Sequence, residues 1–158
     1  MDRAIGQLQL EFLSPEQIAA SRAIMGVDSQ LIRDGTYFIV EEDGEIAGCG
    51  GWSRRATLYG GDHSKELREP RLLNPATEPA RIRAMYTDPA FARRGVGRLI
   101  LQLCEEAAAA EGFTRIEMMA TLSGEPLYSA AGYQIICPEA DTIGEVTVPL
   151  LRMGKDLV

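Results

Sequence analysis

The spacing of apolar residues changes along the chain between a period of two and a period near 3.6, and each period predicts its own kind of element. The most regular helical stretch begins near residue 96 and stops at Gly112. Its apolar positions fall on one face of a helix, at Val96, Leu99, Ile100, Leu103, Cys104 and Ala107. The opposite face is polar. We therefore expect an amphipathic helix that packs against the core.

Shorter runs of apolar and β-branched residues, bounded by glycine, proline or aspartate, predict strands. These runs lie at 7–13, 36–41, 45–52, 81–87, 114–120, 133–137 and 145–153. The turn signal Asp43-Gly44 joins the second and third of them into an antiparallel hairpin. Further helices are expected at 14–26, where Ser14 and Gln17 form a capping box, and at 29–33 and 124–131.

Residues 55–79 show no period and contain three prolines, so they predict a long loop. A loop of this length in a compact domain is often functional. The order of elements predicts one α/β domain over 1–158, built on a mixed sheet. With 46% apolar residues, a chain of 158 residues can fill one core.

The charge and composition exclude several classes of protein. A net charge of -7 disfavours a nucleic-acid-binding surface, and no apolar run approaches the ~18 residues of a membrane helix. We therefore expect a soluble, cytoplasmic protein without membrane or nucleic-acid partners. Three widely spaced cysteines, Cys49, Cys104 and Cys137, fit neither a disulfide framework nor a metal site, and are expected to be reduced and mostly buried.

The basic residues concentrate in one part of the sequence. Arg81 and Arg83 precede a second group, Arg93-Arg94-Gly95-Val96-Gly97-Arg98, which leads from a strand into the amphipathic helix. A glycine-bearing loop at the start of a helix presents free backbone N–H groups and the positive end of the helix dipole, and so suits a pyrophosphate. Many strand-to-helix turns, however, use glycine only to reverse the chain and bind no phosphate. An NTPase loop is disfavoured because no Gly-Lys-Ser/Thr follows, and a dinucleotide fold is disfavoured because Ile100 occupies the place of its third glycine.

Taken together, three segments resemble the central motifs of the GNAT acetyltransferase superfamily, in family order and spacing. They are the strand with Met85, Tyr86 and Thr87, the loop from Arg93 to Arg98, and the segment from Tyr128 to Tyr133. The resemblance implies an α/β fold with a mixed, mainly antiparallel central sheet, whose central strands splay apart and are flanked by helices. Acetyl-CoA would occupy the gap. Two positions depart from the family pattern: Ala92 replaces Gln or Arg, and Thr121 replaces Asn.

The resemblance also implies a role for each segment. Backbone groups of Met85, Tyr86 and Thr87 would pair with the pantetheine arm of acetyl-CoA and place an N–H near the thioester oxygen. Backbone amides from Arg93 through Arg94, Gly95, Val96 and Gly97 to Arg98 would hold the pyrophosphate. Tyr128 would protonate the departing thiolate; no metal is expected.

The general base and the acceptor are open at this point. His63, in the 55–79 loop, is one candidate for the base, but a lone loop histidine is more often a solvated bystander, and water is an equal candidate. Recognition of the acceptor is expected to involve the first two helices, the long loop with Trp52 and Tyr59 nearby, and the last two strands. The acceptor is expected to be the primary amine of a small molecule or peptide. The alternatives are a protein lysine or N-terminal acetyltransferase and a non-catalytic acyl-CoA sensor, and the family suggests a possible homodimer.

Overall fold

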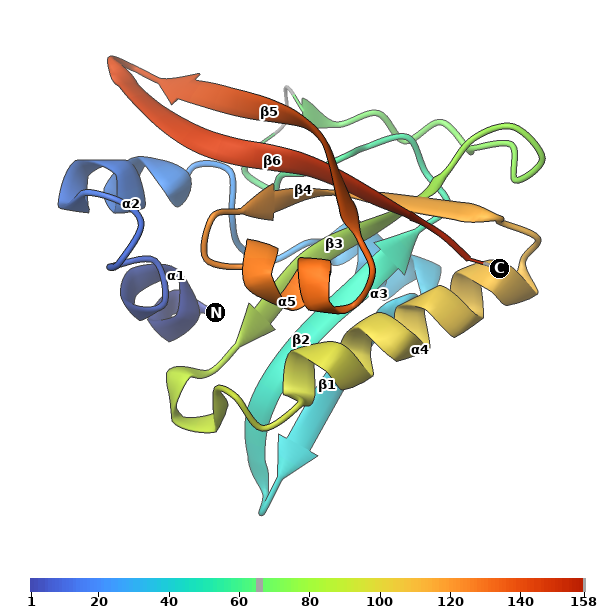
Figure 1. The fold of residues 1–158 in the computed structure, drawn as a ribbon, viewed down its shortest axis with the longest axis horizontal. Coiled ribbons are helices and arrows are strands. Elements are labelled where there is room, and N and C mark those ends of the chain that lie inside the picture. The colour runs from blue at the N-terminus through green and yellow to red at the C-terminus, as the bar shows by residue number, and fades with distance from the viewer. Residues whose placement is uncertain (65–66, 158) are drawn as a thin grey trace.

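The computed structural model describes residues 1–64 and 67–157, and within these ranges six strands form one sheet (Figure 1). The strands are β1 (Tyr37–Glu42), β2 (Glu45–Ser53), β3 (Ala80–Thr87), β4 (Arg115–Thr121), β5 (Gln134–Ile143) and β6 (Val146–Asp156). They lie in the order β1-β2-β3-β4-β6-β5. Every neighbouring pair is antiparallel except β3 with β4. The mixed, mainly antiparallel sheet predicted from the sequence is confirmed.

The helices described are α1 (Asp2–Gln7), α2 (Pro15–Ser21), α3 (Ser29–Asp34), α4 (Val96–Ala110) and α5 (Glu125–Ala130), with a 3-10 turn at Pro89–Phe91. Helix α4 packs across β1, β2 and β3 and buries Ile100, Leu101 and Cys104 against Trp52 and Ile116 in the main core. Val96, Ile100 and Cys104 of the predicted face are buried, but Leu99 is exposed, and Leu101 and Ala108 are buried in addition. Helix α1 packs against β3 and α2 against β6.

The two parallel strands diverge almost at once. Strands β3 and β4 pair only at Ala80 with Ile116 and at Arg81 with Glu117. Beyond these pairs β3 continues to Thr87 and β4 to Thr121 without further hydrogen bonding to each other. The splay in the centre of the sheet is therefore present in this chain, and it leaves the backbone of β3 unpaired on the side that faces β4.

Two expectations for the front of the chain are wrong. Residues 7–13 do not form a strand: α1 occupies 2–7, and the chain then turns, with the N–H groups of Phe12 and Leu13 both bonded to the carbonyl of Gln9. The alternating pattern there reflects a compact turn that buries Gln9 and Leu13. Helix α2 begins at its capping box, as predicted, but ends at Ser21 rather than near Gly26.

The last two strands are longer than predicted. Strands β5 and β6 form a hairpin through Gly144, and β5 runs across Pro138, which the sequence suggested would end it. Proline is tolerated there because β5 is the edge of the sheet, where one side of the backbone needs no partner. The described residues of the 55–79 segment form a loop, as predicted, with an isolated bridge between Arg55 and Leu72. Cys49 and Cys104 are buried, and all three cysteines are free.

An alkaline transition is expected from the tyrosines. Burial disfavours the phenolate and raises the pKa of all five from 10.0, to about 12 for Tyr59 and Tyr86 and further for the others. Above pH 10 the unfolded chain loses protons that the native protein keeps, so the free energy of unfolding falls as pH rises. The fall approaches ~1.4 kcal/mol per pH unit for each buried tyrosine.

Burial also lowers the pKa of Arg83 to about 10 and lowers the pKa of Arg81, and these two groups oppose the trend because the folded protein releases their protons before the unfolded chain does. The free energy of unfolding is still expected to fall as pH rises, because the tyrosines are more numerous. Circular dichroism and tyrosinate absorbance, recorded together across an alkaline titration, are expected to change in one cooperative step. Free ionisation near pH 10 with the fold intact would contradict the buried placement of these rings.

Candidate active site

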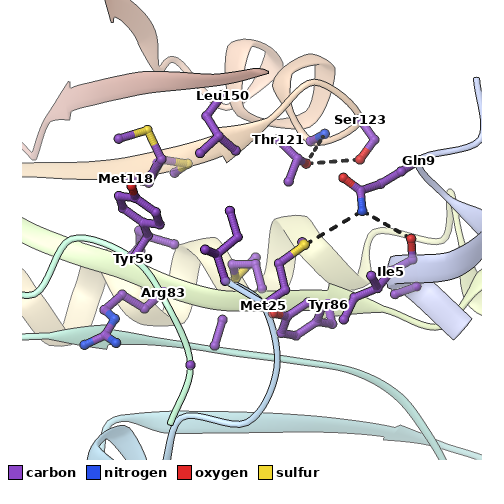
Figure 2. A pocket seen from close by; sticks show the side chains of 18 of the residues that line it. Ile5, Gln9, Met25, Tyr59, Arg83, Tyr86, Met118, Thr121, Ser123 and Leu150 are labelled. Carbon is purple, nitrogen blue, oxygen red and sulfur yellow. Dashed lines mark hydrogen bonds between the residues drawn. The ribbon is translucent and has the colours of Figure 1, made fainter. Parts of the chain in front are cut away.

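A pocket opens where β3 and β4 diverge, and we call it the central pocket. Its walls come from α1, the segments before α3 and within the long loop, β3, β4, α5 and β6. The lining residues are 4–5, 8–9, 24–26, 58–61, 82–87, 118–119, 121, 123–124, 127–128 and 150. Figure 2 shows Arg83 and Tyr86 on the β3 side, Met118 and Thr121 on the β4 side, and Gln9 and Tyr59 entering from opposite ends. The pocket thus combines segments from both halves of the chain.

Strand β3 contributes consecutive residues to the pocket because its geometry is irregular. Ala84 has a φ of 53°, and the pairing with β2 shifts between the Cys49–Tyr86 and Gly51–Arg83 pairs. This is a β-bulge, which breaks the alternation of a regular strand and re-aims the residues beside it. The hydroxyl of Tyr37 stabilises the bulge by donating to the carbonyl oxygen of Ala84 at 3.2 Å.

The three β3 residues predicted to contact the co-substrate all line the central pocket. Met85, Tyr86 and Thr87 follow the bulge on the part of β3 that has no β4 partner. Their backbone groups on this side are therefore available to a ligand that lies along the strand. The Tyr86 side chain has a structural contact as well, since its hydroxyl accepts a 2.8 Å hydrogen bond from the N–H of Gly26.

Tyr128 also lines the central pocket, from α5. Its ring is buried and lies edge-on to Tyr133, with 6.1 Å between ring centroids. No described residue forms a hydrogen bond with its hydroxyl, which leaves the O–H free for a ligand. Helix α5 is fixed at its start by Thr121, whose Oγ1 accepts from the N–H of Gly124 at 3.1 Å. Burial raises the pKa of Tyr128 well above its ordinary value, with smaller contributions from Tyr86 and Cys104, so the phenol stays protonated.

The loop from Arg93 to Arg98 lies beside the central pocket but does not line it. Gly95, with a φ of 80°, is the N-cap of α4, and no side chain of the described residues caps the first turn. The N–H groups of that turn are therefore free, as the phosphate hypothesis requires. Arg93 and Arg98 are exposed there, while Arg94 pairs with Glu42 at 3.1 Å.

Gly97 has a packing role in the structure. A Cβ atom on Gly97 would lie 2.7 Å from Cδ2 of Leu127 and 3.8 Å from Oγ1 of Thr87. Both neighbours line the central pocket. The absence of a side chain at 97 therefore lets the start of α4 approach α5 and the end of β3, which brings the loop next to the pocket.

Several residues of the pocket were missed by sequence reasoning. One of them is the buried Arg83, whose guanidinium pairs with the fully buried Asp28 and donates to the carbonyl of Gly60 at 2.9 Å. Arg68 extends the network, lying 3.1 Å from Asp28 and 2.9 Å from Asp62. These ion pairs hold the 24–28 and 58–62 segments against β3. They join positions too far apart in sequence for any local motif to reveal them.

Other candidates lie outside the pocket. Nε2 of His63 is 2.6 Å from the carbonyl oxygen of Arg22, so the ring fastens the long loop to the end of α2 and does not line the central pocket. Trp52 packs edge-on against Phe113 in the core. Asp88 accepts from the N–H of Ala90 and caps the turn after β3. Tyr59 does line the pocket.

The described ranges contain neither a membrane-spanning helix nor a metal cluster. In residues 1–64 and 67–157, no helix is long and apolar enough to cross a membrane. The same residues contain no group of three or more His, Cys, Asp or Glu side chains placed to hold a metal ion.

Comparison with known proteins agrees with this geometry. The profile of the acetyltransferase (GNAT) family matches residues 5–133. The structure of a GCN5-related N-acetyltransferase from Rhodopseudomonas palustris is similar over 98% of this chain and 83% of that chain, with a TM-score of 0.69 and 19% identity. Naa20 from Chaetomium thermophilum, in complex with a bisubstrate analogue, is similar over 91% of this chain and 84% of its own, with a TM-score of 0.61 and 17% identity.

A third structure, YncA from Salmonella typhimurium with its cofactor acetyl-CoA, is similar over 90% of this chain and 73% of that one, with a TM-score of 0.60 and 14% identity. No curated protein matches the chain. The family match spans most of the sequence and includes the splayed strands, the α4 loop and Tyr128. The chain therefore belongs to the acetyltransferase (GNAT) family and is an acetyl-CoA-dependent N-acetyltransferase.

Proposed function

We propose that the protein transfers the acetyl group of acetyl-CoA to a primary amine of a small molecule or peptide, by direct attack of the amine on the thioester. The observation that carries this proposal is the meeting of two elements in one pocket: the unpaired backbone of Met85–Thr87 and the free hydroxyl of Tyr128. Acyl transfer needs a donor for the developing oxyanion and an acid for the leaving thiolate. The first element supplies N–H donors, and the second supplies the acid.

The proton balance fits a buried phenol. The amine nitrogen forms a bond to the acetyl carbon, the C–S bond breaks, the thiolate takes the proton of Tyr128, and the resulting phenolate is reprotonated from water. A phenol of raised pKa is a weaker acid, but the same burial raises the pKa of the thiol, ordinarily ~8.5. The difference between the two groups is therefore roughly preserved. The amine proton leaves to water, or the amine binds in its neutral form, since no carboxylate or imidazole of the described residues lines the central pocket.

The fit of acetyl-CoA rests on two features of this chain. The pantetheine arm would lie along β3 beyond Arg81, where β4 has diverged, and its amides would pair with the free strand backbone. The pyrophosphate would lie on the uncapped first turn of α4, where Gly95 turns the chain and Arg93 and Arg98 are exposed. Backbone amides alone can bind the pyrophosphate. Ala92, which replaces the Gln or Arg of the family pattern, is therefore compatible with a pyrophosphate site.

Gly95→Ala is expected to weaken acetyl-CoA binding about tenfold, because a Cβ atom at a φ of 80° is strained and distorts the amides that hold the pyrophosphate. Gly35→Ala is the matched control. Gly35 has a φ of 71° at the end of α3, and nothing lies within 4 Å of its Cβ position. Both variants should lose a similar ~1–2 kcal/mol of stability. Calorimetric titration with acetyl-CoA distinguishes the two variants. Equal affinities of Gly95→Ala and Gly35→Ala for acetyl-CoA would show that the first turn of α4 does not bind the pyrophosphate.

The proposal is tested by following CoA release from acetyl-CoA with polyamines, amino acids, aminoglycosides, aliphatic and aromatic monoamines, and peptides. Turnover on a small amine supports the proposal. Turnover confined to peptides would transfer the assignment to a protein lysine or N-terminal acetyltransferase. Tight acetyl-CoA binding without turnover on any acceptor would favour a sensor.

A further inference from the structure

Gln9 is a buried polar residue of the central pocket. It follows α1, is only 2% exposed, and lines the central pocket. A buried amide must satisfy both its N–H₂ and its carbonyl oxygen, or leave one for a ligand. The orientation of this amide therefore decides whether the pocket presents a hydrogen-bond donor or an acceptor to a substrate.

The contacts of Gln9 fix which way its amide points. Nε2 donates to the carbonyl oxygen of Ile5 at 3.2 Å and to Oγ of Ser21 at 3.3 Å, and it lies 3.8 Å from the sulfur of Met25. The carbonyl of Ile5 can only accept. The hydroxyl of Ser21 is already committed as a donor to the carbonyl of Ile18 at 2.7 Å, so it too accepts from Gln9. A flipped amide would place oxygen against two acceptors.

The carbonyl oxygen of Gln9 is therefore directed into the central pocket, as Figure 2 shows. No described residue donates a hydrogen bond to this Oε1. The chain thus positions one neutral hydrogen-bond acceptor in the pocket, held by three contacts behind it. A substrate N–H is the partner that such an oxygen takes.

The surroundings of Gln9 specify the rest of the ligand. The lining residues include five aliphatic or thioether side chains, Leu8, Ile24, Met25, Met119 and Leu150, and the hydroxyls of Thr121 and Ser123 that also line the pocket bond to each other at 3.0 Å. Arg83 is the charged residue among the described lining residues, and Asp28 already neutralises it. Such walls favour an apolar body and penalise a second charge, because removing an unpaired ion from water is costly.

We propose that the acceptor is a primary amine on an uncharged, apolar body, and that Gln9 recognises it through a hydrogen bond from the amine N–H to Oε1. This inference rests on the proposed function and names its substrate class. Gln9 is a binding residue: it holds the nitrogen but moves no proton. The flexible methionines accept apolar bodies of varied shape, aromatic or alkyl.

Binding of phenethylamine to the CoA-saturated protein tests the inference without requiring turnover. Wild type is expected to bind phenethylamine at least about tenfold more tightly than putrescine, whose second ammonium has no partner in these walls. Gln9→Met, which keeps the length of the side chain and removes its carbonyl, is expected to weaken phenethylamine binding about five- to tenfold. Gln7→Met is the matched control, since Gln7 is an exposed neighbour outside the pocket.

Titration with acetyl-CoA checks that the Gln9→Met protein is folded, and its affinity should match wild type. Equal binding of phenethylamine by Gln9→Met and wild type would overturn the role of Gln9. Preference for putrescine, or no binding of phenethylamine, would overturn the substrate class. If phenethylamine binds as expected but is never acetylated, the inference stands and the proposed acetyl transfer fails. If only charged amines are acetylated, the proposed function stands and the inference fails.

Discussion

Tyr128→Phe is expected to lower kcat by about a hundredfold or more while acetyl-CoA affinity stays unchanged, because the variant removes the proposed proton donor and leaves the ring in place. The hydroxyl has no partner among the described residues, so its removal should change the free energy of unfolding by less than ~0.5 kcal/mol. Initial rates of CoA release at saturating acetyl-CoA and amine, together with urea denaturation, measure both quantities.

Tyr133→Phe provides the matched control. Tyr133 is also a buried ring, edge-on to Tyr128, but its hydroxyl donates to Oε1 of Glu105 at 2.9 Å and it does not line the central pocket. This variant should lose ~1 kcal/mol of stability and keep its kcat. The reverse pattern, with Tyr133→Phe slow and Tyr128→Phe unaffected, would contradict the assignment of the acid.

Asp28→Ala is expected to destabilise the protein by ~3–5 kcal/mol, because it leaves the buried guanidinium of Arg83 without a counter-ion and removes a partner of Arg68. Burial already lowers the pKa of Arg83 to about 10, a sign that its charge is costly in this place. The 24–28 and 58–62 segments should loosen as well. Urea denaturation measures the loss, and Asp28→Asn, which keeps the shape, gives a second value if the alanine variant does not fold.

Asp2→Ala is the comparison for this effect. Asp2 also pairs with an arginine, Arg22, at 3.1 Å, but its side chain is 94% exposed, so the loss should stay below ~1 kcal/mol. A similar small loss for Asp28→Ala would show that the Arg83–Asp28 pair is not a determinant of the fold. If Asp28→Ala greatly lowers stability but leaves the KM for the acceptor unchanged, the Arg83–Asp28 pair stabilises the fold without shaping the acceptor site.

The back half of the chain could be predicted because its signals are local. The apolar face of α4 repeats over four turns, and the turn residues around Gly95 and Gly132 limit where the neighbouring elements begin and end. The family motifs lie in the same stretch, so the β3 backbone and Tyr128 were identified together. The splay itself needed the resemblance, since nothing in the strands reveals where two parallel neighbours part.

The acceptor side could not be predicted in the same way. Gln9 lies in a turn whose alternation resembles a strand, and its orientation depends on Ser21 and Ile5, which meet only in the folded chain. The pairing of Arg83 with Asp28 likewise links separate segments. The bulge at Ala84 has no glycine or proline to indicate it, because a tertiary contact from Tyr37 supports its strained backbone.

The central claim is that an amine held in the central pocket takes the acetyl group directly from acetyl-CoA. The most direct test is mass spectrometry of a reaction containing the protein, acetyl-CoA carrying an isotopic label in the acetyl group, and an amine that supports CoA release. The account predicts one labelled acetyl group on the amine nitrogen for each CoA released, with no labelled protein intermediate. Release of CoA with label only in free acetate, or label retained on a cysteine, would contradict it.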